Sequence, residues 1–258
     1  MTKLRGMLAA AAVTLALAGG AERALAAGAE VVPPKHDWSF YGLFGTFERP
    51  ALQRGYKVYK DVCSACHAMK FVAFRNLVDI GFTEAEAKAL AEEYQVAGEP
   101  DEFGDPTTRP ARLADAFPSP HANEQAARSA NGGALPPDLS LITKARENGP
   151  DYVRALLVGY KDAPAGVAMA PGMNYNEYFP GHQIAMAAPL SEGIIEYADG
   201  TDASVEQMAE DVTTFLHWAA NPELERRHSM GFQTMIFLIL LTILFWFVKQ
   251  RVWRELDH

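Results

Sequence analysis

The apolar residues of this chain are arranged in two ways. Two nearly unbroken apolar runs lie near the ends, from Met7 to about Gly20 and over the 19 residues from Met230 to Val248. Between them, apolar residues recur every three or four positions, a spacing that predicts helices with one buried face. The clearest of these predicted helices cover residues 47–62 and 204–219.

Caps and prolines predict shorter elements between these two helices. Thr83 to Glu86 has the sequence of a capping box, which predicts a helix reaching about Val96. The segment GIIEYADG at 193–200 predicts a short strand and a turn. Three more short helices are predicted, the second and third with proline near the start, over 123–130, 137–146 and 150–158.

The remaining stretches are dense in Gly, Pro and polar residues, a composition that predicts loops. The longest loops are expected up to about Gly45, over 98–120 and over 159–189. Long ordered loops are often functional. Because the sequence shows neither an internal repeat nor an alternation of strands with helices, we predict an all-α fold, mostly helical with long loops.

The N-terminal apolar run has the features of a secretory signal peptide. Lys3 and Arg5 precede it, and Ala24-Leu25-Ala26 supplies the small residues of a cleavage site. A first membrane span is the alternative, but the run is short for one. We therefore predict a signal peptide at residues 1–26, export of the chain, and a mature chain that begins near Ala27.

The C-terminal apolar run is long enough to cross a membrane. At ~1.5 Å per residue its helix measures about 28 Å, close to the ~30 Å hydrocarbon core of a bilayer. Basic residues follow it, which favours a cytoplasmic end. We predict a single-pass protein of a bacterial-type inner membrane, with a periplasmic domain at 27–225, a transmembrane helix at 229–249 and a cytoplasmic tail at 250–258.

Acidic residues are concentrated in two segments. The chain carries a net charge of −9, and removal of residues 1–26, which contribute +2, leaves −11. Residues 79–115 hold ten acidic and three basic residues, and residues 188–225 hold nine acidic residues and no Lys or Arg. Such segments are either solvated faces or surfaces that attract a basic partner. Nucleic acid requires the opposite sign, so we predict no nucleic-acid binding.

The two cysteines of the chain stand in the sequence VCSACH, at the end of the first predicted helix. A structural zinc site needs four ligands, and neither a second cysteine pair nor a spaced histidine pair is present. A disulfide across so short a loop would add little stability and leave His67 unexplained. In an exported helical protein, this motif predicts one covalent haem c, attached through Cys63 and Cys66, with His67 as an axial ligand.

The second axial position of the iron has several candidates when spacing alone is considered. Met69 lies too near His67 to reach the opposite face, and Met208 belongs to the apolar stripe of the helix at 204–219, where it is expected to pack in the core. A methionine ligand would suit electron transfer, whereas an open position would suit catalysis or ligand binding. The candidates that remain are Met169, Met173, Met186, His182 and His217.

Five segments together carry a resemblance to a known family. They are RGYKVYKDVCSACHAMKFVAFRNL, NGGALPPDLS, DYVRALLVGY, NEYFPGHQIAMAAPL and DVTTFLHWAANPE, the last followed by RRHSMG and the apolar run. In this order, from about Trp38 to the C-terminus, they resemble the cytochrome c1 family. Members of that family are the haem-bearing subunits of quinol–cytochrome c oxidoreductase, the cytochrome bc1 complex.

The resemblance implies roles for individual residues. Cys63, Cys66 and His67 match the haem attachment motif, and Met186 matches the second axial ligand. Gly55 would allow the first helix to cross the last helix of the domain closely. Five further residues match positions at the haem, the first two near a propionate and the others against the haem edge: Arg146, Tyr152, Asn131, Pro136 and Pro137.

The resemblance also implies a one-electron relay that is not an enzyme on its own and has no catalytic residues. Its electrons would come from a Rieske iron–sulfur protein and pass to a soluble cytochrome c whose basic face docks on the acidic surface. Cytochrome b would be its membrane partner, in a dimeric complex. The alternatives are a monohaem carrier for another oxidase or a photosynthetic centre, a haem enzyme with an open iron site, and a purely structural membrane anchor.

Overall fold

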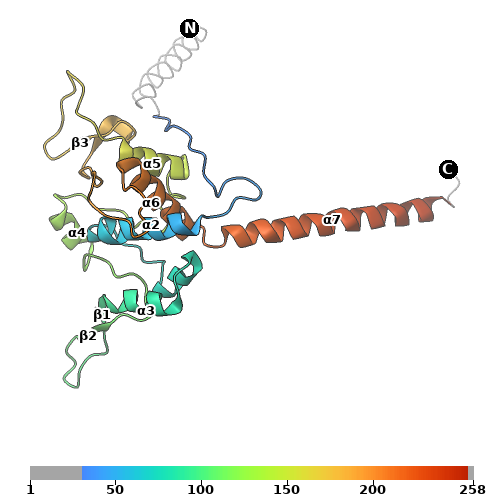
Figure 1. The fold of residues 1–258 in the computed structure, drawn as a ribbon, viewed down its shortest axis with the longest axis horizontal. Coiled ribbons are helices and arrows are strands. Elements are labelled where there is room, and N and C mark those ends of the chain that lie inside the picture. Colours follow the sequence, from blue (N-terminus) through green and yellow to red (C-terminus); the bar gives the residue numbers. More distant parts are fainter. Residues whose placement is uncertain (1–30, 255–258) are drawn as a thin grey trace, which may run out of the picture.

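The computed structural model describes residues 31–254, which form a helical domain from which one long helix projects (Figure 1). Residues 31–48 contain no helix or strand, as expected for the irregular start of the domain. The predicted signal peptide, its cleavage near Ala27 and the end of the predicted tail lie outside the described residues. The proposed domain boundaries therefore stay predictions.

Two crossed helices, α2 (Arg49–Asp61) and α6 (Val205–Ala220), form the centre of the domain. The Ser204 hydroxyl caps α6 by accepting a hydrogen bond of 3.2 Å from the Gln207 N–H. At the crossing, any Cβ on Gly55 would collide with the backbone carbonyl of Asp211 and the Cβ of Phe215. The prediction that Gly55 permits a close helix crossing is thereby confirmed.

A buried ion pair connects α2 and α6 at the same level. The Arg54 guanidinium donates two hydrogen bonds of 2.9 Å to the two carboxylate oxygens of Asp211, whose side chain is only 1% exposed. A third bond of 2.9 Å reaches Asp199. Around this pair, aromatic and aliphatic side chains fill the core, among them Leu52, Tyr56, Tyr59, Met208, Val212, Phe215 and Trp218.

Three of the shorter predicted helices are present, and two of them have side-chain caps. In α3 (Glu84–Glu92), Thr83 accepts a hydrogen bond from the Glu86 N–H and the Glu86 carboxylate accepts one from the Thr83 N–H, which is the predicted capping box. The side chain of Asn123 caps α4 (Glu124–Ala130). The third, α5 (Gly149–Val158), packs against α6. Short 3-10 helices lie at Cys63–Ala65, Phe74–Ile80 and Pro180–His182.

Three details of the prediction are wrong. Residues 137–146 form turns instead of a helix, because the Leu139 backbone and the Asp138 and Ser140 side chains are hydrogen-bonded to residues 68–71. Residues 193–200 form turns without a strand. Helix α3 ends at Glu92 instead of reaching about Val96, because the chain continues into β1 (Gln95–Ala97). This strand pairs antiparallel with β2 (Thr108–Pro110).

The proline-rich segment 159–189 is an ordered loop. It contains a second antiparallel pair, β3 (Asn174–Tyr175) and β4 (Gln183–Ile184). The buried Asn176 fastens this pair to α5 by donating a hydrogen bond of 2.8 Å from its side-chain amide to the Leu156 carbonyl. The two small sheets do not change the fold class, and the prediction of a mostly helical domain with long loops is confirmed.

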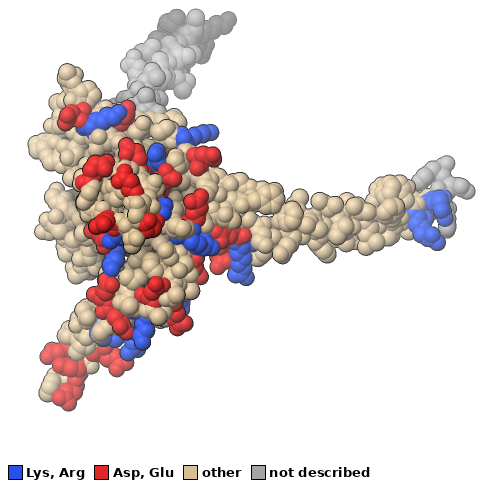
Figure 2. Space-filling model, viewed as in Figure 1, with Lys and Arg blue, Asp and Glu red and all other residues tan. Residues whose placement is uncertain are grey.

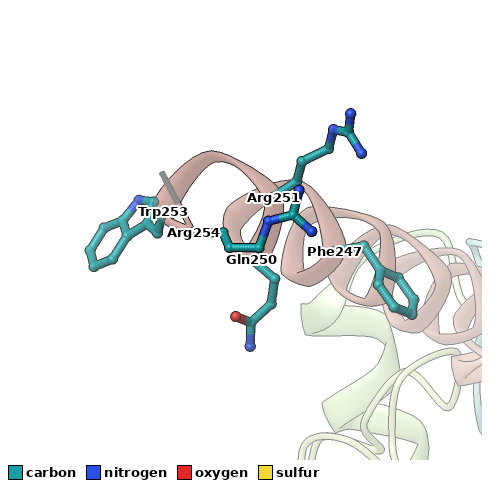
Figure 3. A pocket seen from close by; sticks show the side chains of 5 residues that line it. All are labelled: Phe247, Gln250, Arg251, Trp253 and Arg254. Atoms are coloured by element: carbon teal, nitrogen blue, oxygen red, sulfur yellow. The ribbon is translucent and has the colours of Figure 1, made fainter. Parts of the chain in front are cut away.

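The projecting helix is α7 (Leu224–Trp253), whose 30 residues make it about 45 Å long. Within the described residues it is the one helix long and apolar enough to cross a membrane. Figure 2 shows it free of charged side chains along most of its length, with a basic cluster at its far end. The shallow hollow at that end is lined by residues of this helix and its C-cap (Figure 3), namely Phe247, Gln250, Arg251, Trp253 and Arg254.

Candidate functional site

The cysteine motif lies immediately after α2, at the end of that helix that points away from α7 (Figure 1). The Cys66 and His67 N–H groups both donate to the Cys63 carbonyl, at 3.1 and 2.9 Å, so that the motif forms one tight turn. Both cysteines are free thiols. Burial, with a smaller contribution from Cys66, raises the pKa of the Cys63 thiol to about 12. The turn thus presents two thiols and an imidazole from neighbouring positions.

The orientation of His67 is set by a hydrogen bond to the backbone. Its Nδ1 lies 2.8 Å from the Pro137 carbonyl oxygen. A carbonyl can only accept, so Nδ1 carries the proton and the lone pair is on Nε2. Burial lowers the pKa of the imidazole, although the bond to Pro137 opposes this effect. The ring is therefore held in the neutral form, with the Nε2 lone pair available for a metal.

Residues 137–140 hold the backbone that follows the motif. The Leu139 N–H donates to the Ala68 carbonyl at 2.8 Å. In the opposite direction, the N–H groups of Lys70 and Phe71 donate to the side chains of Asp138 and Ser140, each at 3.1 Å. The predicted site residue Pro137 is thus part of a clamp on His67. This clamp replaces the helix expected from the sequence.

Met186, the predicted second ligand, lies in the ordered loop just after β4. Its carbonyl accepts a hydrogen bond of 3.1 Å from the Tyr160 hydroxyl and one of 3.4 Å from the Asn174 side-chain amide. Tyr160 comes shortly after α5, and its backbone bridges to Asn176. Two side chains from different segments therefore hold the methionine backbone in place.

The alternative histidine candidates each stack on an aromatic ring. His217 stacks on Phe40 with ring centroids 4.4 Å apart, and its Nδ1 lies 3.2 Å from the Thr143 hydroxyl. Burial, helped by nearby positive charges, lowers its pKa to about 4. His182 stacks on Tyr175, and its Nδ1 donates to the Asn176 carbonyl at 3.2 Å. Among the methionines, Met69 and Met208 are fully buried, which confirms the packing role predicted for Met208.

The structure brings some of the remaining predicted residues together. Arg146 is exposed and lies close enough to Tyr152 for its charge to oppose the rise that burial causes in the pKa of the tyrosine hydroxyl. Asn131 uses its amide to donate a hydrogen bond of 2.7 Å to the Ala127 carbonyl, which closes the end of α4. Pro136 is half-buried beside the clamp. Contact of these four residues with a haem stays a prediction.

The donor set fits a haem attached through thioethers. Two thiols stand at the required spacing, and the adjacent imidazole has its Nε2 lone pair available. No group of three or more His, Cys, Asp and Glu side chains suited to a bare metal ion occurs among residues 31–254. Sequence reasoning missed Tyr160 and Asn174, because single polar residues in a loop carry no periodic signal.

Comparison with known proteins agrees with this chemistry. Residues 38–256 match the model of the Cytochrome C1 family. Cytochrome c1 of Rhodospirillum rubrum is 45% identical over 273 aligned positions, which cover all of this chain and 99% of the relative. The cytochrome b-c1 complex catalytic subunit of Candida albicans mitochondria is 49% identical over 227 residues, covering 88% of this chain and 79% of the relative.

A longer relative shows the same similarity over part of its length. The cytochrome b/c1 protein of Bradyrhizobium diazoefficiens is 49% identical over 245 residues, covering 86% of this chain. The chain spans about a third of that protein, 36% of its length. The family match over most of the chain and the near-complete coverage of the Rhodospirillum relative confirm the resemblance seen in the sequence. The chain belongs to the cytochrome c1 family.

Proposed function

We propose that this chain relays single electrons from a Rieske iron–sulfur protein to a soluble c-type cytochrome, as the membrane-anchored monohaem subunit of a cytochrome bc1 complex. Its family membership supports the broader statement that it is a haem-bearing c-type cytochrome subunit of that complex. The observation that carries the proposal is the hydrogen bond from His67 Nδ1 to Pro137, because it leaves Nε2 as the ligand atom within the attachment motif.

In this proposal Cys63 and Cys66 hold one haem c covalently. Each thiol would form a thioether by adding its sulfur and its hydrogen across one vinyl group of the porphyrin, an addition that would need no oxidant. The single C-x-x-C-H motif of the chain sets the number at one haem.

His67 and Met186 are the proposed axial ligands. When bound, haem supplies reversible one-electron chemistry, and a histidine–methionine ligand pair raises its potential. Tyr160 and Asn174 fix the backbone of Met186, and Pro137 fixes the ring of His67. The other proposed haem contacts are Arg146, Tyr152, Asn131 and Pro136. In this proposal these residues bind and orient the haem and exclude water from it, and none of them needs to transfer a proton.

Replacing Met186 with leucine tests the ligand assignment. The reduced Met186→Leu protein is expected to bind carbon monoxide, which the unchanged protein excludes, and its reduction potential should fall. Met173→Leu, in an exposed part of the same loop, is the matched control and should change neither property. A difference spectrum of the reduced protein with and without carbon monoxide gives the first reading, and a redox titration followed by the haem absorbance gives the second. Ready binding of carbon monoxide to the unchanged protein would instead support a haem enzyme with an open site.

The relatives' names support the proposed partners. One is named as part of a b-c1 complex and another as a cytochrome b/c1 protein. We propose that cytochrome b and the Rieske protein are neighbours of this chain in a dimeric inner-membrane complex, with the haem domain in the periplasm. Purification in mild detergent should yield a b-type cytochrome and an iron–sulfur protein together with it. Recovery of a lone monohaem protein would favour the carrier of a different oxidase or photosynthetic centre.

The acidic surface supports docking of a basic cytochrome. Figure 2 shows acidic side chains over much of the visible face of the domain, including the far end of the loop between β1 and β2. The two segments concerned are 92–105 and 192–211, although Asp211 is buried against Arg54 and contributes nothing to the surface. Electron transfer to a basic cytochrome should slow as ionic strength rises. A rate independent of salt would rule out this docking surface.

A further inference from the structure

An exposed apolar loop lies beside the root of α7. We call Tyr41–Phe44 the aromatic loop. Leu43 is 65% exposed, Phe44 is 72% exposed, and Tyr41 is about half exposed. The segment from Trp38 to Phe47 contains no charged residue. Apolar side chains that are clustered and exposed in this way mark a surface that another phase or molecule covers.

The exposure of the aromatic loop is imposed by its anchoring. On either side of it, Phe40 and Phe47 are buried, and their rings lie 5.2 Å apart. The Thr46 N–H donates to the Ser39 carbonyl at 3.1 Å and closes the loop. Gly42 makes the turn with a φ of 84°, a conformation that favours glycine. Leu43 and Phe44 therefore cannot turn inward without opening this closed loop.

Three contacts fasten the aromatic loop and its flanks to the first turns of α7. His228 Nδ1 donates to the Gly45 carbonyl at 3.0 Å. The Phe47 N–H donates to the Glu225 carboxylate at 2.8 Å. The ring of Phe44 meets the ring of Phe232 edge to face, with centroids 5.7 Å apart. These contacts fix the position of the aromatic loop along the axis of α7, beside the first turns of that helix.

The position of the aromatic loop along α7 coincides with the start of the predicted membrane span. Phe232 lies two residues inside the apolar run that begins at Met230, about 3 Å at ~1.5 Å per residue. In Figure 1 the segment containing the loop extends from the domain on the same side as α7. Exposed Arg226 and Arg227 stand on the preceding turn, where lipid headgroups would meet them. Aromatic side chains are enriched at this depth of a bilayer.

We propose that the aromatic loop inserts into the lipid interface beside α7 and forms a second membrane contact of the domain. This inference rests on the proposed membrane anchoring by α7. Lipid is the occupant that the contacts favour, because the loop is uncharged and Phe44 already packs on a ring of the span. Two contacts, helix and loop, fix the tilt of the domain on the membrane, which one helix alone would leave free.

Spin labels on single introduced cysteines test the proposal. The full haem-loaded chain is placed in vesicles of phosphatidylcholine and phosphatidylglycerol, with labels at Phe44→Cys, at the mid-span variant Leu240→Cys, and at Phe103→Cys. Phe103 is the matched control, because it is 83% exposed but lies in the loop between β1 and β2, away from α7. The ratio of collisions with oxygen to collisions with a water-soluble nickel chelate should be several-fold higher at position 44 than at 103, and highest at 240.

Leu43→Cys provides a second reading that keeps the Phe44–Phe232 contact, and it decides the matter if Phe44→Cys loses its haem spectrum. A water-like ratio at 43 and 44 with a hydrocarbon-like ratio at 240 overturns the inference but leaves the anchor intact. A water-like ratio at 240 overturns the anchor and the inference together. Labels at 43 and 44 that are shielded only in the purified complex, and wet in vesicles, would show that a protein covers the loop, which also overturns it.

Discussion

The two sides of the candidate site are the segment that carries His67, which we call the histidine side, and the segment that carries Met186, the methionine side. They are held in place in different ways. His67 follows α2 directly, and α2 is locked to α6 by the glycine crossing and the Arg54–Asp211 ion pair. Its ring and the backbone behind it are then clamped by residues 137–140. The position of the histidine is thus a consequence of the packing of the whole domain.

Met186 depends on fewer contacts. It lies in a loop just after a short hairpin, and its carbonyl is held by the side chains of Tyr160 and Asn174. The hairpin beneath it contains two paired residues in each strand. His67 should therefore lose its position only when the whole domain unfolds, whereas Met186 should become mobile while the domain stays folded.

The largest effect is expected from Arg54→Met. The substitution leaves the Asp211 carboxylate buried without a cation, a change that costs about 3–5 kcal/mol of unfolding free energy. For a domain of this size the melting temperature should fall by roughly 10 °C, since about 1 kcal/mol corresponds to ~2–4 °C. Thermal unfolding of the haem-loaded chain in detergent, followed by circular dichroism, measures the loss.

The matched control is Arg49→Met, which breaks the more exposed ion pair between Arg49 and Glu225. That pair is expected to contribute about 1 kcal/mol or less. Burial already raises the pKa of Asp211 despite Arg54, so without the cation the acid will take up a proton more readily. The loss of unfolding free energy in Arg54→Met should therefore be greatest near neutral pH and become smaller as the pH falls. Equal losses in the two variants would contradict the importance of the buried pair.

A second, smaller effect is expected when His217 gains a proton. Its pKa is about 4 in the folded chain, against an ordinary value of about 6.5. Since the unfolded chain binds the proton more readily, stability is complete above about pH 6.5 and declines as the pH falls toward 4, by up to about 3 kcal/mol. Lys144 and Arg227, which also disfavour the charged ring, act in the same direction. Melting temperatures between pH 7 and 4 measure the decline.

His217→Gln removes this titration and keeps a polar side chain beside Thr143. Carboxylates contribute their own pH dependence to both proteins, so the informative quantity is the difference between the two curves. The difference in melting temperature between the original protein and the variant should become smaller as the pH falls. Parallel curves over this range would show that the burial of His217 does not couple the α6 core to protons.

The histidine side could be predicted from the sequence because its signals are contiguous. The C-x-x-C-H motif directly follows an amphipathic helix, and Gly55 lies near the middle of that helix. The clamp could not be predicted in the same way. Residues 137–146 have the composition of a helix, but hydrogen bonds to residues about 70 positions away draw their N–H groups and side chains into turns. Long-range pairing of this kind overrides local propensity.

The methionine side could be predicted from the sequence to a much smaller extent, because its signals are not contiguous. Spacing placed Met186 only slightly ahead of Met169 and Met173, and the resemblance to the cytochrome c1 family then selected it. The structure adds the physical reason for its fixed position, which is the pair of donors on its carbonyl. Tyr160 lies 26 positions away in the sequence, and no local pattern links a loop tyrosine to a loop methionine.

The smallest effect on stability, and the most direct test of the comparison, is expected from Tyr160→Phe. The variant keeps the ring and removes the hydroxyl that donates to the Met186 carbonyl, which costs about 0.5–1.5 kcal/mol for one hydrogen bond. The melting temperature should fall by only a few degrees. If this bond positions the methionine, the reduced protein should nevertheless bind carbon monoxide more readily than the unchanged chain, because the ligand is held less firmly.

Tyr175→Phe is the matched control, because it removes a hydroxyl from the same hairpin while the ring can still stack on His182. It should leave carbon monoxide binding unchanged. Asn174→Ala removes the weaker donor and should shift binding in the same direction as Tyr160→Phe, by less. Loss of stability in Tyr160→Phe without any change in ligand binding would mean that the loop keeps Met186 in place by its backbone alone. The two sides of the site would then be equally rigid, and the contrast between them would lie in the sequence signal only.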